Sequence, residues 1–268
     1  MSVALIAGRG ALPAAVSLAM PERPLITTVE GFAPDGLAVD VLFRIERLVP
    51  FLRLLSDRGV TQVIFAGAMT RPHLDPALID ADTAQLLPTL MAAMRGGDDA
   101  TLRAVLGIFE DFGFQILGVP DVAPGLVPGE GVLAGTITEA DRADAARAAT
   151  IVAALGAVDV GQGAVVQQGL CLAVEVLAGT DAMLASLPGL PAALRPDPAR
   201  GRGLFYKAAK PDQDLRIDLP TLGPDTLGAV VAAGLGGVAF QADRVICLDL
   251  PAMQGLAAEL GLFLWARP

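Results

Sequence analysis

The densest group of charged side chains lies between Lys207 and Asp225. It contains the only two lysines of the chain, one arginine and four aspartates: Lys207, Lys210, Asp212, Asp214, Arg216, Asp218 and Asp225. Lysine and arginine bind phosphate oxygens well, and carboxylates hold a divalent metal or orient a water molecule. These residue types therefore suit a diphosphate substrate. In an expected strand over 215–219, alternate side chains share one face, which from the pattern alone is a solvated face or the lining of a cleft.

Four motifs stand where helices are expected to begin. Gly8 and Gly10 follow an apolar run, and such a turn brings backbone N–H groups close to a phosphate or simply turns the chain. A dinucleotide motif would need a third glycine where Pro13 stands. Asp98 and Asp99, after Gly96-Gly97, and Thr180 and Asp181, after Gly179, are helix caps or ligand contacts. Asp225, after Gly223-Pro224, is an N-cap or a residue at a cleft edge.

The rare residues exclude several kinds of site. His73 is the single histidine, so a zinc site of Cys and His ligands cannot be assembled, and a Ser-His-Asp triad would depend on a turn-like surface segment. Cys171 and Cys247 lie in apolar runs and are expected to be reduced core residues. Any metal ligands should therefore be oxygens, which suits Mg²⁺ or Mn²⁺.

Composition indicates a large folded protein. The chain has 268 residues, 53% of them hydrophobic, and a formal net charge of −10, which argues against a nucleic-acid partner. The first residues run directly into a strand pattern without a signal-peptide pattern, and no uncharged stretch is a convincing membrane span. These features predict a cytoplasmic protein.

Strand and helix signals alternate in the first half. We expect strands at 3–7, 25–29, 60–66 and 114–119 and helices at 13–20, 48–57, 75–95 and 99–111. Such alternation predicts a Rossmann-like, mostly parallel sheet with helices on both faces. The predicted N-terminal α/β domain covers 1–128, and a linker rich in glycine and proline covers 129–137.

The second half, 138–268, is predicted to be an α/β catalytic domain with a mixed sheet and flanking helices. We expect helices at 138–156, 225–233 and 251–260, with Thr138 as an N-cap. Expected strands are 164–166, 170–175, 204–208, 215–219, 237–240 and 245–248. The chain as a whole is therefore predicted to be an α/β protein of two domains.

Several segments, in this order, resemble the LpxI family. The opening Leu5-Ile6-Ala7-Gly8-Arg9-Gly10-Ala11-Leu12-Pro13 is similar to its first motif. Further similar segments are Gly96 to Arg103, Pro128 to Leu133, Asp159 to Gly163 and Glu175 to Leu184. The most specific is Lys207-x-x-Lys210-Pro211-x-Gln213-Asp214-Leu215-Arg216-x-Asp218-Leu219-Pro220-x-x-Gly223-Pro224-Asp225-Thr226. The resemblance runs from the first strand to Leu262.

The resemblance implies an activity. The family cleaves UDP-2,3-diacylglucosamine to 2,3-diacylglucosamine 1-phosphate (lipid X) and UMP, in lipid A biosynthesis, with a divalent metal that is typically Mg²⁺. It has two α/β domains joined by a linker, with the substrate between them. The aspartate of its Gly-Pro-Asp motif is essential, and Asp225 occupies that position. The alternative solution, a metallophosphoesterase with several His and Asp ligands, is excluded by the single histidine.

With the resemblance, the catalytic residues are expected to be Asp225, Lys207, Lys210 and Arg216, with Asp225 and Asp218 as metal ligands. Expected substrate contacts are Gly8, Gly10, Ala11, Leu12, Asp98, Asp99, Gln168, Thr180, Asp181, Asp214, Asp218, Thr221 and Gly223. Since the lipid substrate resides in the inner leaflet, we expect transient contact with the cytoplasmic face of the inner membrane. The resemblance and the apolar content favour a homodimer.

Two alternatives stay open at this stage. A lipid or nucleotide-sugar carrier would need the cations but has less use for the carboxylates, and metal-dependent release of UMP distinguishes it from an enzyme. An NAD-linked enzyme is disfavoured by Pro13 and by the lack of a convincing ribose-binding acid beyond Glu30.

Overall fold

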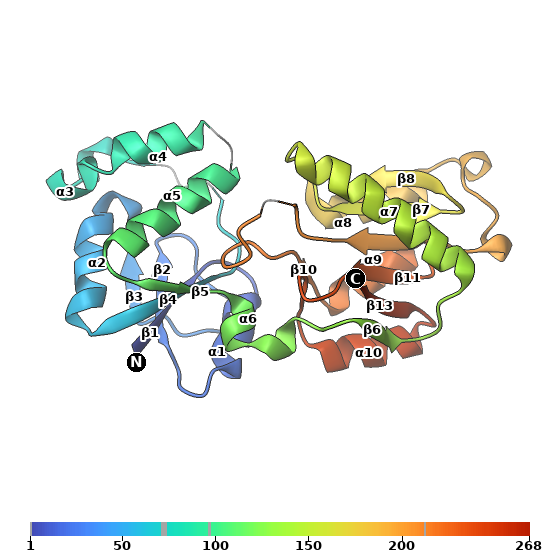
Figure 1. Cartoon of the computed structure of the whole chain (residues 1–268), viewed down its shortest axis with the longest axis horizontal. Coiled ribbons are helices and arrows are strands. Elements are labelled where there is room, and N and C mark those ends of the chain that lie inside the picture. The colour runs from blue at the N-terminus through green and yellow to red at the C-terminus, as the bar shows by residue number, and fades with distance from the viewer. Residues whose placement is uncertain (1, 71–73, 96–97, 212) are drawn as a thin grey trace. The chain divides into compact units, whose positions relative to one another are not determined.

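The computed structural model describes residues 2–70, 74–95, 98–211 and 213–268 (Figure 1). The chain forms two compact units. The first comprises Met1–Gly125 together with Asp214–Asp218, and the second comprises Leu126–Gln213 and Leu219–Pro268. The short segment 214–218 thus belongs to the first unit, although the chain on both sides of it belongs to the second.

The first unit is built on a five-stranded sheet in the order β3-β2-β1-β4-β5, in which all pairings are parallel. Its strands are β1 Ser2–Ala7, β2 Leu25–Val29, β3 Val41–Phe43, β4 Val60–Ala66 and β5 Gln115–Leu117. The central strands are apolar because helices cover both faces of a parallel sheet. This order predicts a ligand site beyond the carboxyl ends of β1 and β4, where the strand order reverses.

The α-helices that accompany this sheet are α1 Leu12–Ala19, α2 Leu48–Asp57, α3 Ala81–Ala84, α4 Leu87–Met94, α5 Asp98–Asp111 and α6 Val119–Val122. In α2, the buried residues Leu48, Leu52 and Leu55 recur every three to four positions, which places them on one helix face. Phe51 of the same helix stacks on Phe43 of β3 with 3.7 Å between ring centroids. The periodicity of α2 thus explains how it packs on the sheet.

The second unit contains a six-stranded mixed sheet in the order β6-β13-β11-β9-β7-β8. Its strands are β6 Gly131–Ala134, β7 Gly163–Gln167, β8 Leu170–Val174, β9 Leu204–Lys207, β11 Gly237–Gln241 and β13 Phe263–Arg267. Strands β9, β11 and β13 are mutually parallel, whereas β7 is antiparallel to both β8 and β9. A separate parallel pair joins β10, Thr221–Leu222, to β12, Ile246–Cys247.

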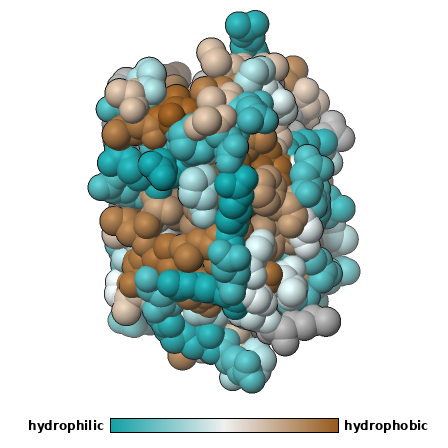
Figure 2. All heavy atoms as spheres, turned by 90° about the vertical axis from the view of Figure 1, so that its left-hand side faces the viewer, coloured by the Kyte–Doolittle hydropathy of each residue, from teal (hydrophilic) through white to brown (hydrophobic). Residues whose placement is uncertain are grey.

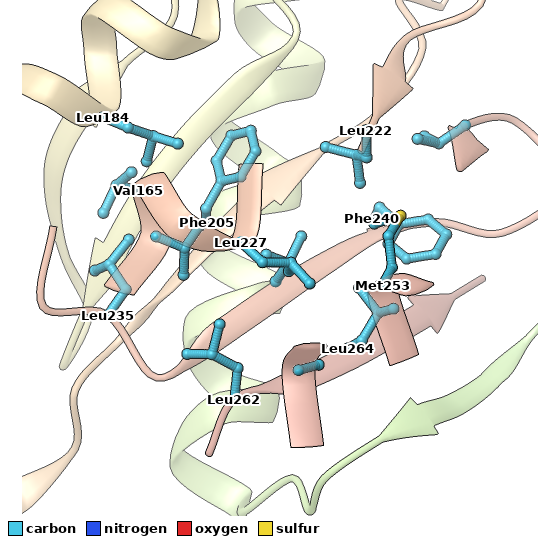
Figure 3. Close-up of a cluster of buried hydrophobic side chains, with 14 of the residues drawn as sticks. Val165, Leu184, Phe205, Leu222, Leu227, Leu235, Phe240, Met253, Leu262 and Leu264 are labelled. Atoms are coloured by element: carbon cyan, nitrogen blue, oxygen red, sulfur yellow. The ribbon is translucent and has the colours of Figure 1, made fainter. Parts of the chain in front are cut away.

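Helices cover both faces of this mixed sheet. They are α7 Glu139–Ala157, α8 Gly179–Ser186, α9 Pro224–Ala232 and α10 Leu250–Glu259. Successive residues of β9 point to opposite faces: Leu204 and Tyr206 pack with α7, and Phe205 packs with the cluster that includes Leu184 and Leu227 (Figure 3). The second unit therefore has three layers, with one core on each side of the sheet. Short 3₁₀ helices cover Ile45–Arg47, Pro76–Leu78, Pro124–Leu126, Leu187–Gly189, Ala192–Leu194 and Pro198–Arg200.

The predicted fold class, two α/β domains with a Rossmann-like first sheet and a mixed second sheet, is confirmed. Thr138 is the N-cap of α7, as expected. The predicted strand at 215–219 is wrong: residues 215–217 form a turn in which the N–H of Asp218 donates to the carbonyl of Asp214. Strands β3 and β13 were not predicted. Residues 131–134, inside the segment expected to be a linker, form edge strand β6.

The two cysteines differ in environment. Cys247 is buried in the second core, and burial raises its pKa to about 12. Cys171 is exposed on β8, so the prediction that both cysteines are core residues is wrong for Cys171. The reason is that β8 is the outer strand of the sheet, where an apolar run does not ensure burial on both faces. Both thiols are free.

The surface of the first unit is mixed in character. On the face shown in Figure 2, polar side chains separate the apolar patches from one another. Scattered exposed apolar residues are normal on a folded protein. Among the residues that the structure describes, no helix combines the length and the apolar character needed to cross a bilayer.

Candidate active site

One edge of the second sheet gathers most of the predicted catalytic residues of that unit. Strands β9, β11 and β13 end there, and the register pairs Lys207, the last residue of β9, with Gly163, the first residue of antiparallel β7. Strand β8 also ends at this edge, because Val174 pairs with Ala164. Ligands of open α/β sheets commonly bind beyond the carboxyl ends of the strands. We call this side the carboxyl edge.

Lys207 is held at the carboxyl edge by a buried polar chain of three side chains. Its Nζ donates to Thr180 Oγ1 at 2.7 Å, and Thr180 Oγ1 donates to Glu175 Oε2 at 3.0 Å. The ammonium and the carboxylate are themselves 4.0 Å apart. Lys207 is 6% exposed and Glu175 is 8% exposed. Charged side chains are rarely buried without partners, and these hydrogen bonds give each of the two a partner.

Lys210 lies in the loop that follows β9 and has a different partner. Its Nζ donates to Asp159 Oδ1, forming an ion pair in which Lys210 is mostly buried and Asp159 is about half exposed. Asp159 itself adopts a positive φ of 56° between α7 and β7. The two lysines of the chain are therefore held by acids on two separate segments that meet this edge.

Asp225 reaches the carboxyl edge through helix α9. The helix ends next to Gly234 and Leu235, and the N–H of Gly236 donates to the carbonyl of Gly203 just before β9, at the opposite edge. Because α9 runs back from the carboxyl edge to the start of β11, its first turn lies at the carboxyl edge. Asp225 is exposed in that turn, and among the described residues its carboxylate has no hydrogen-bond or ion-pair partner.

The expected capping role of Asp225 is not what the structure shows. Gly223 is the N-cap of α9, and the N–H of Gly223 donates to Thr226 Oγ1 at 3.3 Å. Thr221 lies two residues earlier in β10, where its hydroxyl contacts the carbonyl of Leu219. The carboxylate of Asp225 is thus left to face solvent beside the exposed start of the helix, where a negative charge is favoured.

The donor chemistry of this edge fits a magnesium ion. Mg²⁺ is commonly held by one or two carboxylates together with substrate phosphates and water, and the unpartnered carboxylate of Asp225 is a ligand of that kind. Among the described residues, no group of three or more His, Cys, Asp or Glu is placed to bind a metal. The second predicted ligand, Asp218, belongs to the first unit. Metal binding by Asp225 and Asp218 stays a prediction.

The segment 214–218 carries its own ion-pair network within the first unit. Arg216 Nη2 is 2.7 Å from Asp214 Oδ2, and Arg216 Nη1 is 2.7 Å from Glu110 Oε1 of α5. The adjacent Ile217 packs against the apolar core of the first unit. Hydrogen bonding to Asp214, and then to Glu110, raises the pKa of Arg216, and the same guanidinium lowers the pKa of Asp214. These contacts attach the segment to α5.

The glycine motif closes the end of β1 in the first unit. The N–H of Gly8 donates to the carbonyl of Ala66 at 2.8 Å, and Arg9 and Ala68 exchange two backbone hydrogen bonds. A Cβ on Gly8 would lie 2.6 Å from the carbonyl oxygen of Ala68, so glycine is required for this approach. Gly10 has a φ of 90°. Ala11 is exposed and Leu12 half-buried at the start of α1, at the reversal point of the strand order.

The remaining predicted contacts lie at the other end of β7, next to Thr180 in α8, in the first unit, or outside what is described. Gln168 lies beyond the other end of β7, where its Nε2 donates to the carbonyls of Asp197 and Gly201. From the register it is about 16 Å along the strand from Gly163. Asp181 is exposed in the first turn of α8. Asp98 and Asp99 begin α5. His73, Gly96, Gly97 and Asp212 lie outside the described residues.

A cleft of about 780 Å³ opens at the opposite edge of the second sheet, where β11 and β13 begin. It is lined by Thr138, Asp141, Arg200, Arg202 and Phe263, among others. Thr138 and Asp141 cap each other at the start of α7, with the N–H of Thr138 donating to Asp141 Oδ2 at 2.8 Å. Because the N–H of Asp141 already donates to Thr138 and the Asp141 carboxylate lies there, this cleft suits a diphosphate less than the carboxyl edge does.

Several participants were not among the predicted site residues. Glu175 and Asp159 hold the two lysines, and Gly161 and Gly163 pack against Glu175. A Gly-x-Gly pair just before a strand, together with an acid at the end of the next strand, is the signal that points to them in the sequence. The pairing itself depends on the register of β7 between β8 and β9.

Comparison with known proteins gives consistent matches over both units. Residues 2–126 match the LpxI N-terminal domain, and residues 129–265 match the LpxI C-terminal domain. The chain is 38% identical to the UDP-2,3-diacylglucosamine pyrophosphatase LpxI of Caulobacter vibrioides (strain ATCC 19089 / CIP 103742 / CB 15). That similarity covers 97% of this chain and 95% of the relative.

Proposed function

This chain belongs to the LpxI family, and from that premise we propose that it hydrolyses the pyrophosphate bond of UDP-2,3-diacylglucosamine in lipid A biosynthesis. Water adds to one phosphorus and the bridging P–O bond breaks, which gives UMP and 2,3-diacylglucosamine 1-phosphate. The expected similarity to the family is confirmed by both domain matches. The proposed site is the carboxyl edge of the second sheet.

The observation that carries this proposal is that a carboxylate and an ammonium group lie on the same side of the second sheet. Asp225 presents a carboxylate that has no partner among the residues that the structure describes, and Lys207 brings a buried ammonium to the end of β9 on the same side of the sheet. Hydrolysis of a diphosphate needs an oriented water and cations for the phosphoryl oxygens. An exposed acid and two held cations on the same side of the sheet supply both kinds of group.

In the proposed mechanism, side chains of this protein position the attacking water and stabilise negative charge on the substrate. Asp225 accepts a hydrogen bond from the attacking water and orients it toward phosphorus. Lys207 and Lys210 stabilise the negative charge that develops on the phosphoryl oxygens. A bound Mg²⁺, held by Asp225 and the diphosphate, would neutralise charge on the substrate. The contacts of Arg216 with Asp214 and Glu110 support an anchoring role more directly than the catalytic role first expected.

Apolar side chains around the same edge support contact with a lipid. Val158 and Val160 precede Gly161, and Val176 and Leu177 follow Glu175; all four are exposed, and Leu177 fully so. The two loops lie side by side, because a Cβ on Gly161 would come within 2.0 Å of the carbonyl oxygen of Glu175. We call these four residues the apolar rim. We propose that it contacts the acyl chains of the substrate in the cytoplasmic leaflet of the inner membrane.

The decisive experiment measures UMP release from UDP-2,3-diacylglucosamine by the purified protein, with Mg²⁺, with Mn²⁺ and with a chelator. We expect release only with a metal present. Asp225→Ala should abolish it while leaving the unfolding midpoint unchanged, since the side chain is exposed and has no partner within the described part of the chain. Glu139→Ala is the matched control, because Glu139 is an exposed acid in the first turn of α7 at the opposite edge.

Two results would contradict the proposal. Substrate binding without any UMP release, in the presence of either metal, would identify a carrier. Full activity of Asp225→Ala would remove this carboxylate from the mechanism. Running the reaction in ¹⁸O-labelled water assigns the attacked phosphorus, because the label enters whichever product contains it.

A further inference from the structure

Chemistry fixes which group donates and which accepts each hydrogen bond between Glu175, Thr180 and Lys207. An ammonium group only donates hydrogen bonds, so Thr180 Oγ1 must accept from Lys207. A hydroxyl has one hydrogen, and that of Thr180 points to Glu175 Oε2. The hydroxyl therefore has no second hydrogen to give to a phosphate. The predicted contact of Thr180 with the substrate stays a prediction.

The surrounding backbone is shaped to hold the acid of this chain. A Cβ on Gly163 would lie 2.6 Å from Glu175 Oε2, and the N–H of Glu175 donates to the carbonyl of Gly163 at 2.8 Å. Gly161 lies against the backbone of Glu175. Side chains at either glycine would displace the carboxylate. The glycines thus make room for Glu175 at the point where β7 begins.

The same loop also fixes the backbone beside the lysine. Between the two glycines, the carbonyl of Gln162 accepts the N–H of Ala208, the residue after Lys207, at 3.0 Å. Residues 161–163 therefore contact both ends of the Glu175–Thr180–Lys207 relay. They border the carboxylate of Glu175 at one end and bind the backbone next to Lys207 at the other. Four separate segments meet in this arrangement, namely 161–163, Glu175, the start of α8 and the end of β9.

We propose that Thr180 and Glu175 are positioning residues that fix the ammonium of Lys207 at the carboxyl edge. The role of Lys207 in turnover rests on the proposed function, whereas its placement by Thr180 does not. A lysine side chain has four rotatable carbon links, so loss of the relay removes one of the contacts that restrict where the ammonium lies. A misplacement of about 1 Å can reduce turnover by about a hundredfold.

The first test does not need substrate. Because Lys207 and Lys210 are the only lysines, mass spectrometry after brief reductive methylation reports each one separately. In the unaltered protein Lys207 should react much more slowly than Lys210, since Lys207 is 6% exposed. Thr180→Val keeps the shape and removes the hydroxyl, and should raise the rate at Lys207 at least about tenfold. The rate at Lys210, held by Asp159, should not change.

The second test measures turnover in the full-length protein. Thr180→Val should lower kcat by about ten- to a hundredfold with little change in KM, and Thr180→Ser should recover most of the loss. Glu175→Gln should give an intermediate loss, because the amide oxygen still accepts the hydroxyl but lacks the charge. Thr150→Val is the matched control, since Thr150 is an exposed threonine of α7 whose hydroxyl contacts only the carbonyl of Ala146.

The outcomes separate the two proposals. If Thr180→Val leaves both the methylation rate of Lys207 and kcat unchanged, the positioning role is overturned. Equal losses in Thr180→Val and Thr180→Ser would also overturn it, since the hydroxyl would then not matter. If the unaltered protein releases no UMP, the proposed function fails, and the methylation rates still decide the placement of Lys207. Should Thr180→Val unfold, Glu175→Gln provides the same two measurements, compared with Thr180→Ser, which keeps the hydroxyl.

Discussion

Two cations of this protein are held by acids in different ways. Lys207 in the second unit is 6% exposed and contacts Glu175 through the hydroxyl of Thr180, with 4.0 Å between the charged groups. Arg216 in the first unit has a side chain that is 42% exposed and contacts Asp214 and Glu110 directly at 2.7 Å. Direct pairing connects chain segments to each other. The relay instead holds one ammonium at a strand end, close to where a ligand would bind.

The energetic consequences of the two arrangements also differ. Exposed ion pairs contribute about 0–1 kcal/mol, because water already solvates both charges. Removing one partner of a buried pair costs about 3–5 kcal/mol, because a charge is left without compensation. We therefore expect changes at Glu175 or Lys207 to affect both folding and turnover. Changes at Arg216 should affect mainly the local attachment of residues 214–218 to α5.

The largest contrast is expected in kcat. Lys207→Met should lower kcat by about 10²–10³-fold, the loss typical of removing one group that stabilises charge in a transition state. Arg216→Met should lower kcat by less than about tenfold, because it removes an exposed ion-pair network. Steady-state release of UMP with Mg²⁺ measures both. Each variant also needs an unfolding curve, so that loss of fold is not counted as loss of turnover.

These two variants test whether Lys207 and Arg216 really differ in their effect on turnover. An equal loss of kcat in both, with the unfolding midpoint of Arg216→Met unchanged, would show that Arg216 acts in turnover as first expected. Glu110→Gln is then the informative companion, because it removes one partner of Arg216 from α5 without touching the guanidinium. Activity retained in Glu110→Gln but lost in Arg216→Met would assign the role to the guanidinium itself.

A smaller effect is expected on stability from the glycine that borders Glu175. In Gly161→Ala the new Cβ would lie 2.0 Å from the carbonyl oxygen of Glu175, a clash with backbone that no rotamer relieves. We expect a loss of about 3 kcal/mol in the free energy of unfolding, at the upper end of ordinary overpacking costs. Urea denaturation measures it.

The control is a glycine with free space around it. Gly255 is exposed within α10, and nothing lies within 4 Å of the position that a Cβ would take there, so Gly255→Ala should raise stability by up to about 1 kcal/mol. A Gly161→Ala protein as stable as Gly255→Ala would mean that the loop at 161–163 moves freely. It would then not hold Glu175 as the structure indicates.

The contribution of the Asp214–Arg216 pair to stability can be tested by measuring unfolding at different pH values. Hydrogen bonding from Arg216 lowers the pKa of Asp214 in the folded protein, so this contribution to stability is present above the ordinary pKa of about 3.9. It is lost as the pH falls through the lowered value. Asp214→Asn should therefore lose less stability than the unaltered protein between about pH 5 and pH 3. Parallel loss of stability in both proteins would show that the pair contributes nothing.

Other acids of the first unit provide a background for that measurement. The pKa values of Asp40, Glu46 and Asp80 are also lowered, with Arg23 as the main cause for Asp40 and a backbone N–H from Asp75 as the main cause for Glu46. They are present in both proteins. The difference between the two pH curves therefore isolates the contribution of Asp214.

The fold was predictable from the sequence wherever periodicity was decisive. The expected helix at 48–57 and the strand at 60–66 coincide with α2 and β4, because each has an apolar pattern of the right period and ends at a glycine or polar turn. The expected strand at 215–219 failed because alternation alone does not separate a strand from a turn. There the carboxylate of Asp214 accepts the N–H of Arg216 at 3.0 Å, and Arg216 reaches Glu110, a partner 106 residues away.

The site was predictable only in part for a related reason. The residue types at Lys207, Lys210 and Asp225 indicated diphosphate chemistry, and the family resemblance selected the activity. The relay from Lys207 to Thr180 and Glu175 joins residues 27 and 5 positions apart. It depends on β7 lying between β8 and β9 in one register, which local patterns do not encode. For the same reason, the sequence did not show that the turn containing Gln168 lies at the far end of β7.

The smallest expected effect concerns the apolar rim, and it extends the comparison to the surroundings of Lys207. Leu177 is fully exposed two residues after Glu175, whereas the exposed Leu194 lies near Arg195, whose guanidinium donates to the carbonyl of Ala233 at the opposite edge. Full burial of a leucine side chain contributes about 1.5–3 kcal/mol, and partial insertion into a bilayer contributes less. Leu177→Ser should therefore weaken cosedimentation with lipid vesicles a few-fold, and Leu194→Ser should not. Equal behaviour of the two variants would exclude the rim as the lipid contact, because both leucines are largely exposed and only Leu177 lies beside the Lys207 relay.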